Sequence, residues 1–193
     1  VELWDGEEMT DSRSIRVGFR SASIRTEPDA GGVGFVIVVN GRDIHVRGAN
    51  WIPDDAFLHR VDRARYARRL AQAEFAGINL LRVWGGGIYE SDDFYAECDE
   101  RGILTWQDFL LACAAYAEEE PLRSEFEAEA REAIARIGAH PSLVVFNGNN
   151  ENLWGRQEWG WDKRLDGRTW GESYYYDLFP RLVAELAPHV AYT

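Results

Sequence analysis

The chain has little cysteine, almost no lysine and no excess of positive charge. Its 193 residues contain two cysteines and a single lysine, Lys163, and the formal net charge is −12. Two cysteines cannot build a disulfide framework, and so acidic a chain lacks the basic face that nucleic acid or an anionic membrane surface requires. No apolar run reaches the length of a membrane span. These absences are compatible with a neutral partner such as a sugar.

Signals for metals and cofactors are also missing. The histidines show no pairing at metal-ligand spacing, so we expect no metal site. No Gly-x-Gly-x-x-Gly turn follows the first expected strand, which argues against a dinucleotide fold. We interpret Cys98 and Cys113 as buried or half-buried thiols. No leader is evident and we expect a cytoplasmic rather than a secreted protein, although an internal piece of a longer protein would lack a leader in any case.

Tryptophan, in contrast, is abundant. The chain has eight tryptophans, and aromatic rings stack on the C–H faces of pyranose sugars as readily as they fill a core. Composition alone therefore leaves a carbohydrate site and simple core packing as equal interpretations.

The first 34 residues differ in pattern from the rest. Ser14–Arg20 alternates polar and apolar residues, which predicts a half-buried antiparallel strand, and the glycines and proline of Thr26–Gly34 predict a linker. A lone strand needs partners, so we expect residues 1–34 to be the end of an upstream β-sandwich domain. Phe35–Val46 then predicts a β-hairpin that turns at Asn40-Gly41, because both turn residues accept positive φ.

From residue 35 onward, apolar runs of strand length alternate with longer amphipathic stretches. Four such units predict an α/β fold with a parallel sheet and helices outside it. Polar residues gather at the carboxyl ends of all four strands, where the active sites of (β/α)8 barrels lie. We therefore favour about four units of a (β/α)8 TIM barrel in residues 35–193 over an open doubly wound sheet. The expected strands are His45–Asn50, Ile78–Trp84, Ile103–Asp108 and Leu143–Asn147, and the expected helices are Asp62–Ala76, Ser91–Arg101, Pro121–Ile137 and Ser173–Ala187.

The fourth strand leads into a polar run, Asn147–Asn152. The run sets one carboxylate, Glu151, beside an apolar strand that would disfavour its charged form, as a glycosidase general acid requires. Asn149 and Asn150 offer amide donors to sugar hydroxyls. An amide-rich turn that satisfies its own backbone is an equal alternative.

The other three strand ends also carry candidate site residues. The second ends in Arg82 and Trp84 before three glycines, which predict close backbone approach or unusual dihedral angles. Arg82 is suited to a bidentate pair with a carboxylate, and Trp84 to the wall of a sugar subsite. The third ends in Asp108, an acceptor for hydroxyls or an ion-pair partner, and the first in Asn50 and Trp51. Each cluster alone also fits a loop, a cap or a core residue.

Taken in order, the clusters resemble the β-mannosidases of glycoside hydrolase family 2. The matching pieces are Arg47–Pro53, Arg82–Gly87, Trp106–Phe109 and Asn147–Asn152. The resemblance runs from about Phe35 to the C-terminus. It implies a retaining enzyme that removes terminal β-D-mannose from the non-reducing end of a β-mannoside oligosaccharide. No cofactor is implied, because proton transfer and a carboxylate nucleophile suffice.

The resemblance also implies roles for individual residues. Glu151 matches the acid/base, which protonates the leaving oxygen and then activates water, and Asn150 matches the contact to the 2-hydroxyl. The other matches are to substrate contacts: Trp84 and Asp108 in the subsite for the terminal mannose, Arg82 beneath it, and, more loosely, Trp154 and Trp159.

A retaining glycosidase needs a second carboxylate as nucleophile. In the family it lies on a later strand, so we expect it beyond Thr193 and expect this chain to be inactive alone. Half a barrel leaves open strand edges, which favour self-association or local rearrangement. Two alternatives remain: another family 2 activity (β-glucuronidase, β-galactosidase or glucosaminidase), and a sugar-binding module without catalysis.

Overall fold

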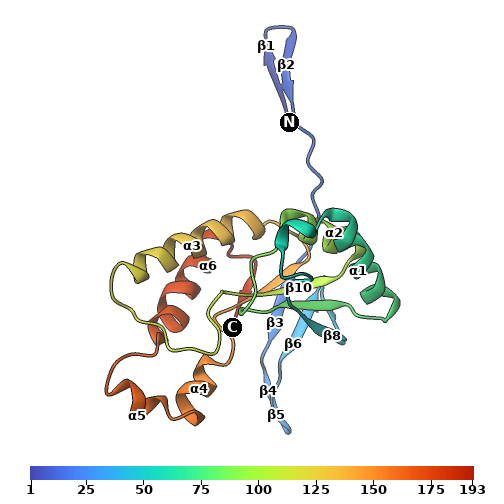
Figure 1. Cartoon of the computed structure of the whole chain (residues 1–193). Coiled ribbons are helices and arrows are strands. Elements are labelled where there is room, and N and C mark those ends of the chain that lie inside the picture. Colours follow the sequence, from blue (N-terminus) through green and yellow to red (C-terminus); the bar gives the residue numbers. More distant parts are fainter.

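The computed structural model describes all 193 residues and centres on a parallel sheet. Five strands lie in the order β12-β11-β10-β9-β8, with helices along one face (Figure 1). Strands that are neighbours in this sheet also follow one another along the chain, as repeated β/α units require. The α/β class is confirmed, and four strands overlap the expected ones. The strands are β8 (Gly48–Trp51), β9 (Leu80–Val83), β10 (Leu104–Asp108), β11 (Leu143–Asn147) and β12 (Ala191–Tyr192).

The first three connections in this sheet each contain one long helix. These are α1 (Arg63–Phe75), α2 (Asp92–Arg101) and α3 (Leu122–Ile137), and all three overlap the predicted helices. The Asp62 side chain caps α1 by accepting from the backbone N–H of Arg65 at 2.8 Å. The larger apolar cluster of the chain lies between these helices and the sheet. None of the helices combines the length and the apolar character that a membrane-spanning segment needs.

The connection after β11 contains the helix expected at Ser173–Ala187, with a π-helical segment (Tyr174–Leu178) that continues into α6 (Phe179–Leu186). Two short helices precede it, α4 (Asn152–Glu158) and α5 (Trp161–Leu165). They lie away from the main helical layer (Figure 1). The two are separated at Gly160, whose φ of 69° interrupts a right-handed helix, and Lys163 is exposed on α5.

A smaller antiparallel sheet lies on the other face of the parallel sheet. Its central strand β6 (Val36–Val39) pairs with β3 (Ala22–Arg25) and with β7 (Arg42–Asp43). Asn40 and Gly41 have φ values of 51° and 72°, which confirms the predicted hairpin turn. Apolar side chains of β3 and β6 pack with those of β9, β10 and β11 in a second core cluster.

A groove of about 750 Å³ runs between this hairpin and the parallel sheet. Its lining is mainly apolar and includes Phe35 and Trp106. Asn50 and Arg82 also line it. Since those two residues stand at strand ends, the groove leads to the edge of the sheet where the candidate site residues gather.

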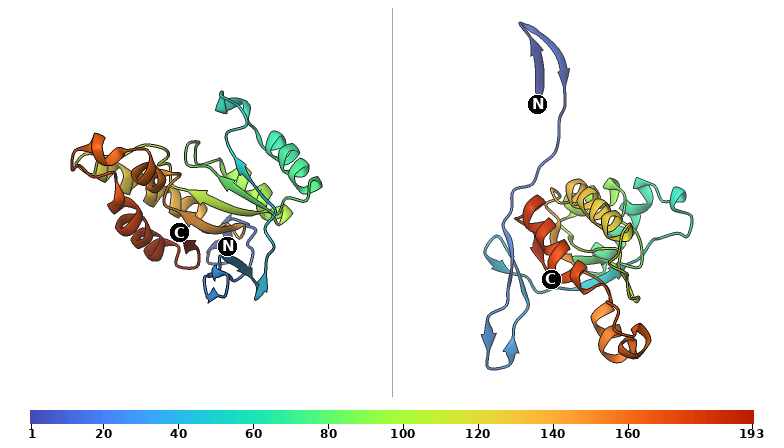
Figure 2. Two further views of the ribbon diagram at one scale, coloured as in Figure 1. Left: turned by 90° about the horizontal axis from the view of Figure 1, so that it is seen from below. Right: turned by 90° about the vertical axis from the view of Figure 1, so that its left-hand side faces the viewer.

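The prediction of a strand at Ser14–Arg20 is wrong. No strand lies between β2 (Glu8–Ser12) and β3, and the apolar residues of this stretch are exposed. The alternating pattern has no partner strand beside it, and an unpaired strand has no ladder of hydrogen bonds. Instead, β1 (Glu2–Asp5) pairs with β2 in a hairpin that projects from the body on an extended connection (Figures 1 and 2).

Arg20 attaches this connection to the body. Its guanidinium donates to the backbone carbonyl oxygens of Pro141, Leu143 and His189, next to the amino-terminal ends of β11 and β12. Burial lowers the pKa of Arg20 from its ordinary value, and Asp99 opposes that shift. The short elements that complete the fold are β4 (Pro28–Asp29), β5 (Gly32–Val33) and a 3-10 turn at Leu58–Arg60.

Candidate active site

The carboxyl ends of the parallel strands bring several predicted site residues together. The strand register sets Asn50 of β8 beside Arg82 of β9, and Asp108 of β10 beside Asn147 of β11. Arg82 Nη1 donates to Asn50 Oδ1 at 3.3 Å. Asn150 follows three residues after β11 and joins the same group, since Arg82 Nη2 donates to its Oδ1 at 2.8 Å.

Asp108 is the buried anchor of this group. Arg82 binds it through two N–H groups, with Nη2 to Oδ2 at 2.6 Å and Nε to Oδ1 at 3.1 Å. The backbone N–H of Gly85 donates to Oδ2 at 3.0 Å, and Asn147 Nδ2 donates to Oδ1 at 2.8 Å. Burial raises the pKa of the Asp108 carboxyl, against the opposing charge of Arg82. Both oxygens are therefore engaged inside the protein.

Glu151 lies directly after Asn150, and its side chain is exposed. The apolar surroundings expected from the preceding strand do not enclose it. Its Oε2 accepts from the thiol of Cys113 at 3.3 Å, and Asn150 Nδ2 donates to the same sulfur at 3.3 Å. The candidate acid/base is therefore open to solvent on one side and held by a side chain of the loop after β10 on the other.

Cys113 is the site residue that the sequence did not reveal. The interpretation of both cysteines as buried or half-buried thiols holds for Cys98 but is wrong for Cys113, which is exposed. The available signal was position: Cys113 follows Asp108 by five residues, in the loop after a strand whose end was already a candidate. Loops at one edge of a parallel sheet meet, but which of their side chains touch depends on backbone angles that no pattern shows.

The backbone in this region confirms how closely the two loops pair. Cys113 N donates to Asn150 O at 2.9 Å, and Asn150 N donates to Leu111 O at 2.9 Å. Cys113 and Glu151 adopt left-handed conformations, with φ values of 55° and 62°. Such angles are uncommon outside glycine and asparagine and are maintained by the surrounding structure.

Trp84 and the three glycines after it form a tight turn. A Cβ on Gly86 would lie 2.0 Å from the ring of Trp84, and one on Gly85 would lie 2.7 Å from the carbonyl oxygen of Phe109. The predicted close backbone approach is confirmed. The turn leaves Trp84 half-buried at the end of β9, one strand away from Asp108.

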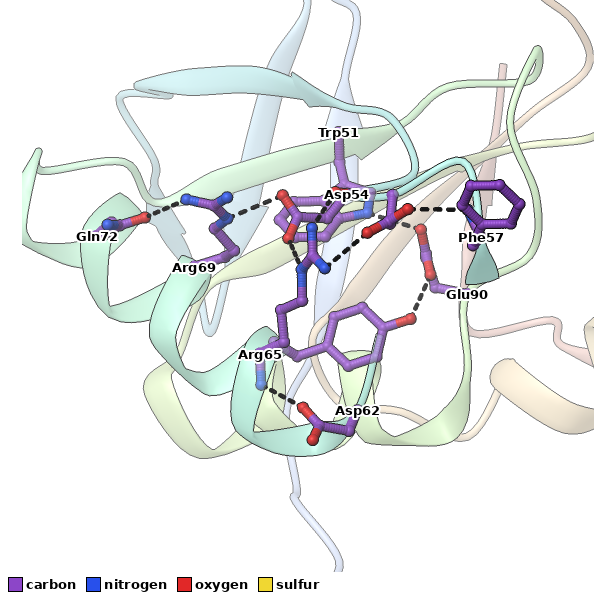
Figure 3. A network of polar contacts seen from close by, with 10 residues as sticks. Trp51, Asp54, Phe57, Asp62, Arg65, Arg69, Gln72 and Glu90 are labelled. Carbon is purple, nitrogen blue, oxygen red and sulfur yellow. Dashed lines mark hydrogen bonds and ion pairs between the residues drawn. The ribbon is translucent and has the colours of Figure 1, made fainter. Parts of the chain in front are cut away.

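Trp51 lies on the opposite face of the sheet, among the helices. Its indole packs against Phe94 with ring centroids 4.8 Å apart, and Nε1 donates to Glu90 Oε1 at 2.8 Å. Glu90 is buried, and its Oε2 accepts from the Tyr66 hydroxyl at 2.5 Å; burial and Glu90 raise the pKa of Tyr66 to about 12. Figure 3 shows Trp51 facing Glu90, with the Asp54–Arg65 ion pair beside them.

Trp154 and Trp159 stand apart from the Arg82 group. Trp154 lies within α4, and Trp159 follows its last residue. Both rings are partly exposed, and their centroids are 6.2 Å apart. Helix α4 begins directly after Glu151, so both tryptophans are close in sequence to the candidate acid/base.

Known β-mannosidases are similar to this chain in sequence. No protein-family model matches the chain. β-Mannosidase from Bos taurus is 42% identical over 142 residues, which cover 72% of this chain and 16% of that protein. β-Mannosidase B from Emericella nidulans is 34% identical over 201 residues, which cover 100% of this chain and 24% of that protein.

Solved structures give the same result. The β-D-mannosidase of Dictyoglomus thermophilum matches with a TM-score of 0.90 at 42% identity, over 96% of this chain and 23% of that one. A β-glucuronidase of Parabacteroides merdae matches with a TM-score of 0.69 at 18% identity, over 99% of this chain and 22% of that one, which is a likeness of fold alone.

The fold and these similarities place the chain among the glycoside hydrolases of family 2. Within that family the chain is β-mannosidase-like. It spans 16 to 24% of the length of the two curated relatives.

Proposed function

We propose that the protein containing these residues is a retaining exo-β-mannosidase with Glu151 as its acid/base. The observation that carries the proposal is the position of Glu151. It stands at the carboxyl end of β11, next to Asn150, whose amide is held by Arg82 at 2.8 Å. The curated relatives that bear the name β-mannosidase support the same activity.

In this proposal Glu151 and Asn150 have different tasks. Glu151 donates a proton to the leaving oxygen and then takes one from water, the two tasks of the acid/base in a retaining enzyme. Its exposed carboxylate is accessible to a substrate at the sheet edge. Asn150 contacts the 2-hydroxyl of the mannose, where a contact that strengthens in the transition state contributes to rate.

The remaining predicted residues would form the subsite around these two. We assign Trp84 to its wall and Asn50 to its rim. Asp108 would act on the sugar through Arg82 and Asn147, because its own oxygens are already bonded within the protein. Two further assignments complete the set: Trp51 supports the strand end from the helical face, and Trp154 with Trp159 contacts the substrate beyond the terminal mannose.

We also propose that the five strands belong to a (β/α)8 barrel. Their parallel order follows the chain from β8 to β12, as successive barrel strands would. Residues 35–193 would then begin the barrel and residues 1–34 would end a β-sandwich domain, with the β3–β6 pairing joining the two ranges. The nucleophile would come from residues outside these 193, and we expect the isolated chain not to hydrolyse p-nitrophenyl β-mannoside.

Substitution of Glu151 in the intact gene product tests the assignment. Glu151→Ala should lower kcat/KM on an alkyl β-mannoside by about 10²- to 10⁴-fold, the usual contribution of general acid–base catalysis. A dinitrophenyl mannoside should be cleaved at its first step with far less loss, since that leaving group needs no proton. Added azide should restore turnover and give a mannosyl azide of retained configuration, because an anionic nucleophile needs no general base.

Glu158→Ala is the matched control, since Glu158 is an exposed carboxylate on α4. It should leave all these rates unchanged. Full activity of Glu151→Ala on the alkyl mannoside, or no response to azide, would contradict the proposed role. A parallel panel of p-nitrophenyl glucuronide, galactoside and glucosaminide separates the sister activities of the family.

A further inference from the structure

A continuous run of hydrogen bonds connects the buried carboxylate of the site to the exposed one. It begins at Asp108, which binds Arg82 with Oδ2 to Nη2 at 2.6 Å. It passes from Arg82 Nη2 to Asn150 Oδ1 at 2.8 Å, and from Asn150 Nδ2 to Cys113 Sγ at 3.3 Å. It ends with Cys113 Sγ donating to Glu151 Oε2 at 3.3 Å.

The chemistry of these groups fixes the direction of every bond in the run. The guanidinium of Arg82 can only donate, so the amide of Asn150 must turn its oxygen toward Arg82. That orientation leaves the NH2 group of Asn150 facing the sulfur of Cys113, which accepts. The single hydrogen of the thiol is then free to point at Glu151, which accepts when ionised. One arrangement of hydrogens satisfies the whole run.

We propose that Arg82, Asn150 and Cys113 form a relay that fixes the orientation of the Glu151 carboxylate, with Cys113 as the positioning residue in contact with it. The inference rests on the proposed role of Glu151. It assigns the two carboxylate oxygens different tasks: Oε2 is held by the thiol, and Oε1 is left to exchange the proton with the substrate.

The backbone supports a specific rather than an incidental contact. Cys113 and Glu151 are two of the four non-glycine residues of the chain with positive φ, and their side chains meet. The pairing of the two loops through the bonds Cys113 N to Asn150 O and Asn150 N to Leu111 O, each at 2.9 Å, holds both residues in these conformations. Uncommon conformations cost free energy, so their occurrence at one contact points to a role there.

The thiol is also suited to act as a donor. Partial burial and the neighbouring carboxylate of Glu151 raise the pKa of Cys113 above its ordinary value, and the bond from Asn150 opposes the shift. The sulfur therefore keeps its hydrogen at neutral pH. A thiolate in the same place would repel the carboxylate, and the contact would be lost.

The first test compares two replacements of Cys113 in the intact gene product. Cys113→Ala removes the donor and should lower kcat/KM about 3- to 10-fold, mostly in kcat, within the contribution of one neutral hydrogen bond. A group that orients the acid/base should leave KM nearly unchanged, so the split between kcat and KM is the second readout. Cys113→Ser restores an O–H donor and should recover most of the lost kcat. Ala114→Ser, an exposed change in the same loop, is the control.

Two outcomes would overturn the relay. One is an unchanged kcat in Cys113→Ala. The other is an equal loss in the alanine and serine variants, because that would assign the effect to the volume of sulfur. Melting temperatures of all variants show whether any loss reflects unfolding.

A second test leaves Cys113 in place and does not depend on activity. The rate at which N-ethylmaleimide alkylates Cys113 is followed against pH by peptide mass spectrometry. Glu151→Gln removes a negative charge next to the thiol, so thiolate should form at lower pH and alkylation near pH 8 should be about threefold faster. Glu158→Gln should react as the unchanged protein does, and the buried Cys98 should stay unmodified.

Equal alkylation rates in the Glu151→Gln variant and the unchanged protein would refute the contact. If the rates differ but the azide experiment fails, the contact stands and the acid/base assignment falls. The two proposals can therefore fail separately.

Discussion

Asp108 combines full burial with bonds from Arg82, Gly85 and Asn147. Removal of its carboxylate would leave the Arg82 guanidinium partly buried without its counter-charge. Breaking a buried ion pair from one side costs far more than the pair itself contributes. We therefore expect Asp108→Ala to lower the free energy of unfolding by about 3 kcal/mol, measured by urea denaturation of the intact gene product.

An exposed ion pair of the same chain provides the control. Arg25 binds Asp43 through two bonds, at 2.8 and 2.6 Å, on the surface of the small sheet. The geometry is similar, but both partners remain solvated, so Asp43→Ala should lower the free energy of unfolding far less than Asp108→Ala does. Equal losses of unfolding free energy in the two variants would mean that burial does not determine how much the Asp108–Arg82 pair matters for stability.

At the scale of elements, the turn after β9 depends on the absence of a side chain at Gly86. A Cβ there would overlap the ring of Trp84 at 2.0 Å. Because Gly86 is exposed, Gly86→Ala should move Trp84 rather than unfold the chain. A displaced subsite wall should lower kcat/KM on a β-mannoside by roughly 10- to 100-fold, with little change in melting temperature.

Gly34→Ala is the comparison for that turn, since a Cβ on Gly34 would make only an ordinary contact, 3.5 Å from the carbonyl oxygen of Glu27. It should leave activity unchanged. A Gly86→Ala enzyme with normal kinetics would contradict the placement of Trp84 in the subsite.

The elements that the sequence predicts well are those with local stop and start signals. Asp62 caps α1, and Asn40-Gly41 turns the first hairpin. Ser14–Arg20 has a strand pattern without a partner, and strand pairing is not a local property. The short helix α4 has a glycine in its interior and no period long enough to detect.

The same distinction between local sequence signals and long-range contacts applies to the candidate site. The parallel sheet predicts that polar strand ends meet, and Asn50, Arg82 and Asp108 do. Trp51 is adjacent to Asn50 in sequence, yet it lies on the other face, because side chains alternate along a strand and the strand's exact register is not visible in the sequence. The roles of these residues stay predictions.

At the scale of the whole molecule, the parallel sheet has an open edge at β8 beside the apolar groove. Unpaired edges and exposed apolar surface favour association with another chain. We expect the isolated 193-residue chain to self-associate as its concentration rises, measured by sedimentation velocity. Val46→Lys, which places a charge in the groove, should weaken that association.

Val33→Lys is the matched change, because Val33 is exposed on β5 and does not line the groove. It should leave the sedimentation profile as it was. A chain that stays monomeric at all concentrations, or an equal response to both lysines, would argue against association through this edge.

The single lysine gives this molecule an unusual experimental property. Lys163 is exposed on α5, close in sequence to the Trp159–Trp161 ring pair. Within these 193 residues an amine-reactive dye therefore has one side chain to attach to. If Trp159 contacts the substrate as proposed, a dye on Lys163 should report sugar binding through a change in tryptophan quenching.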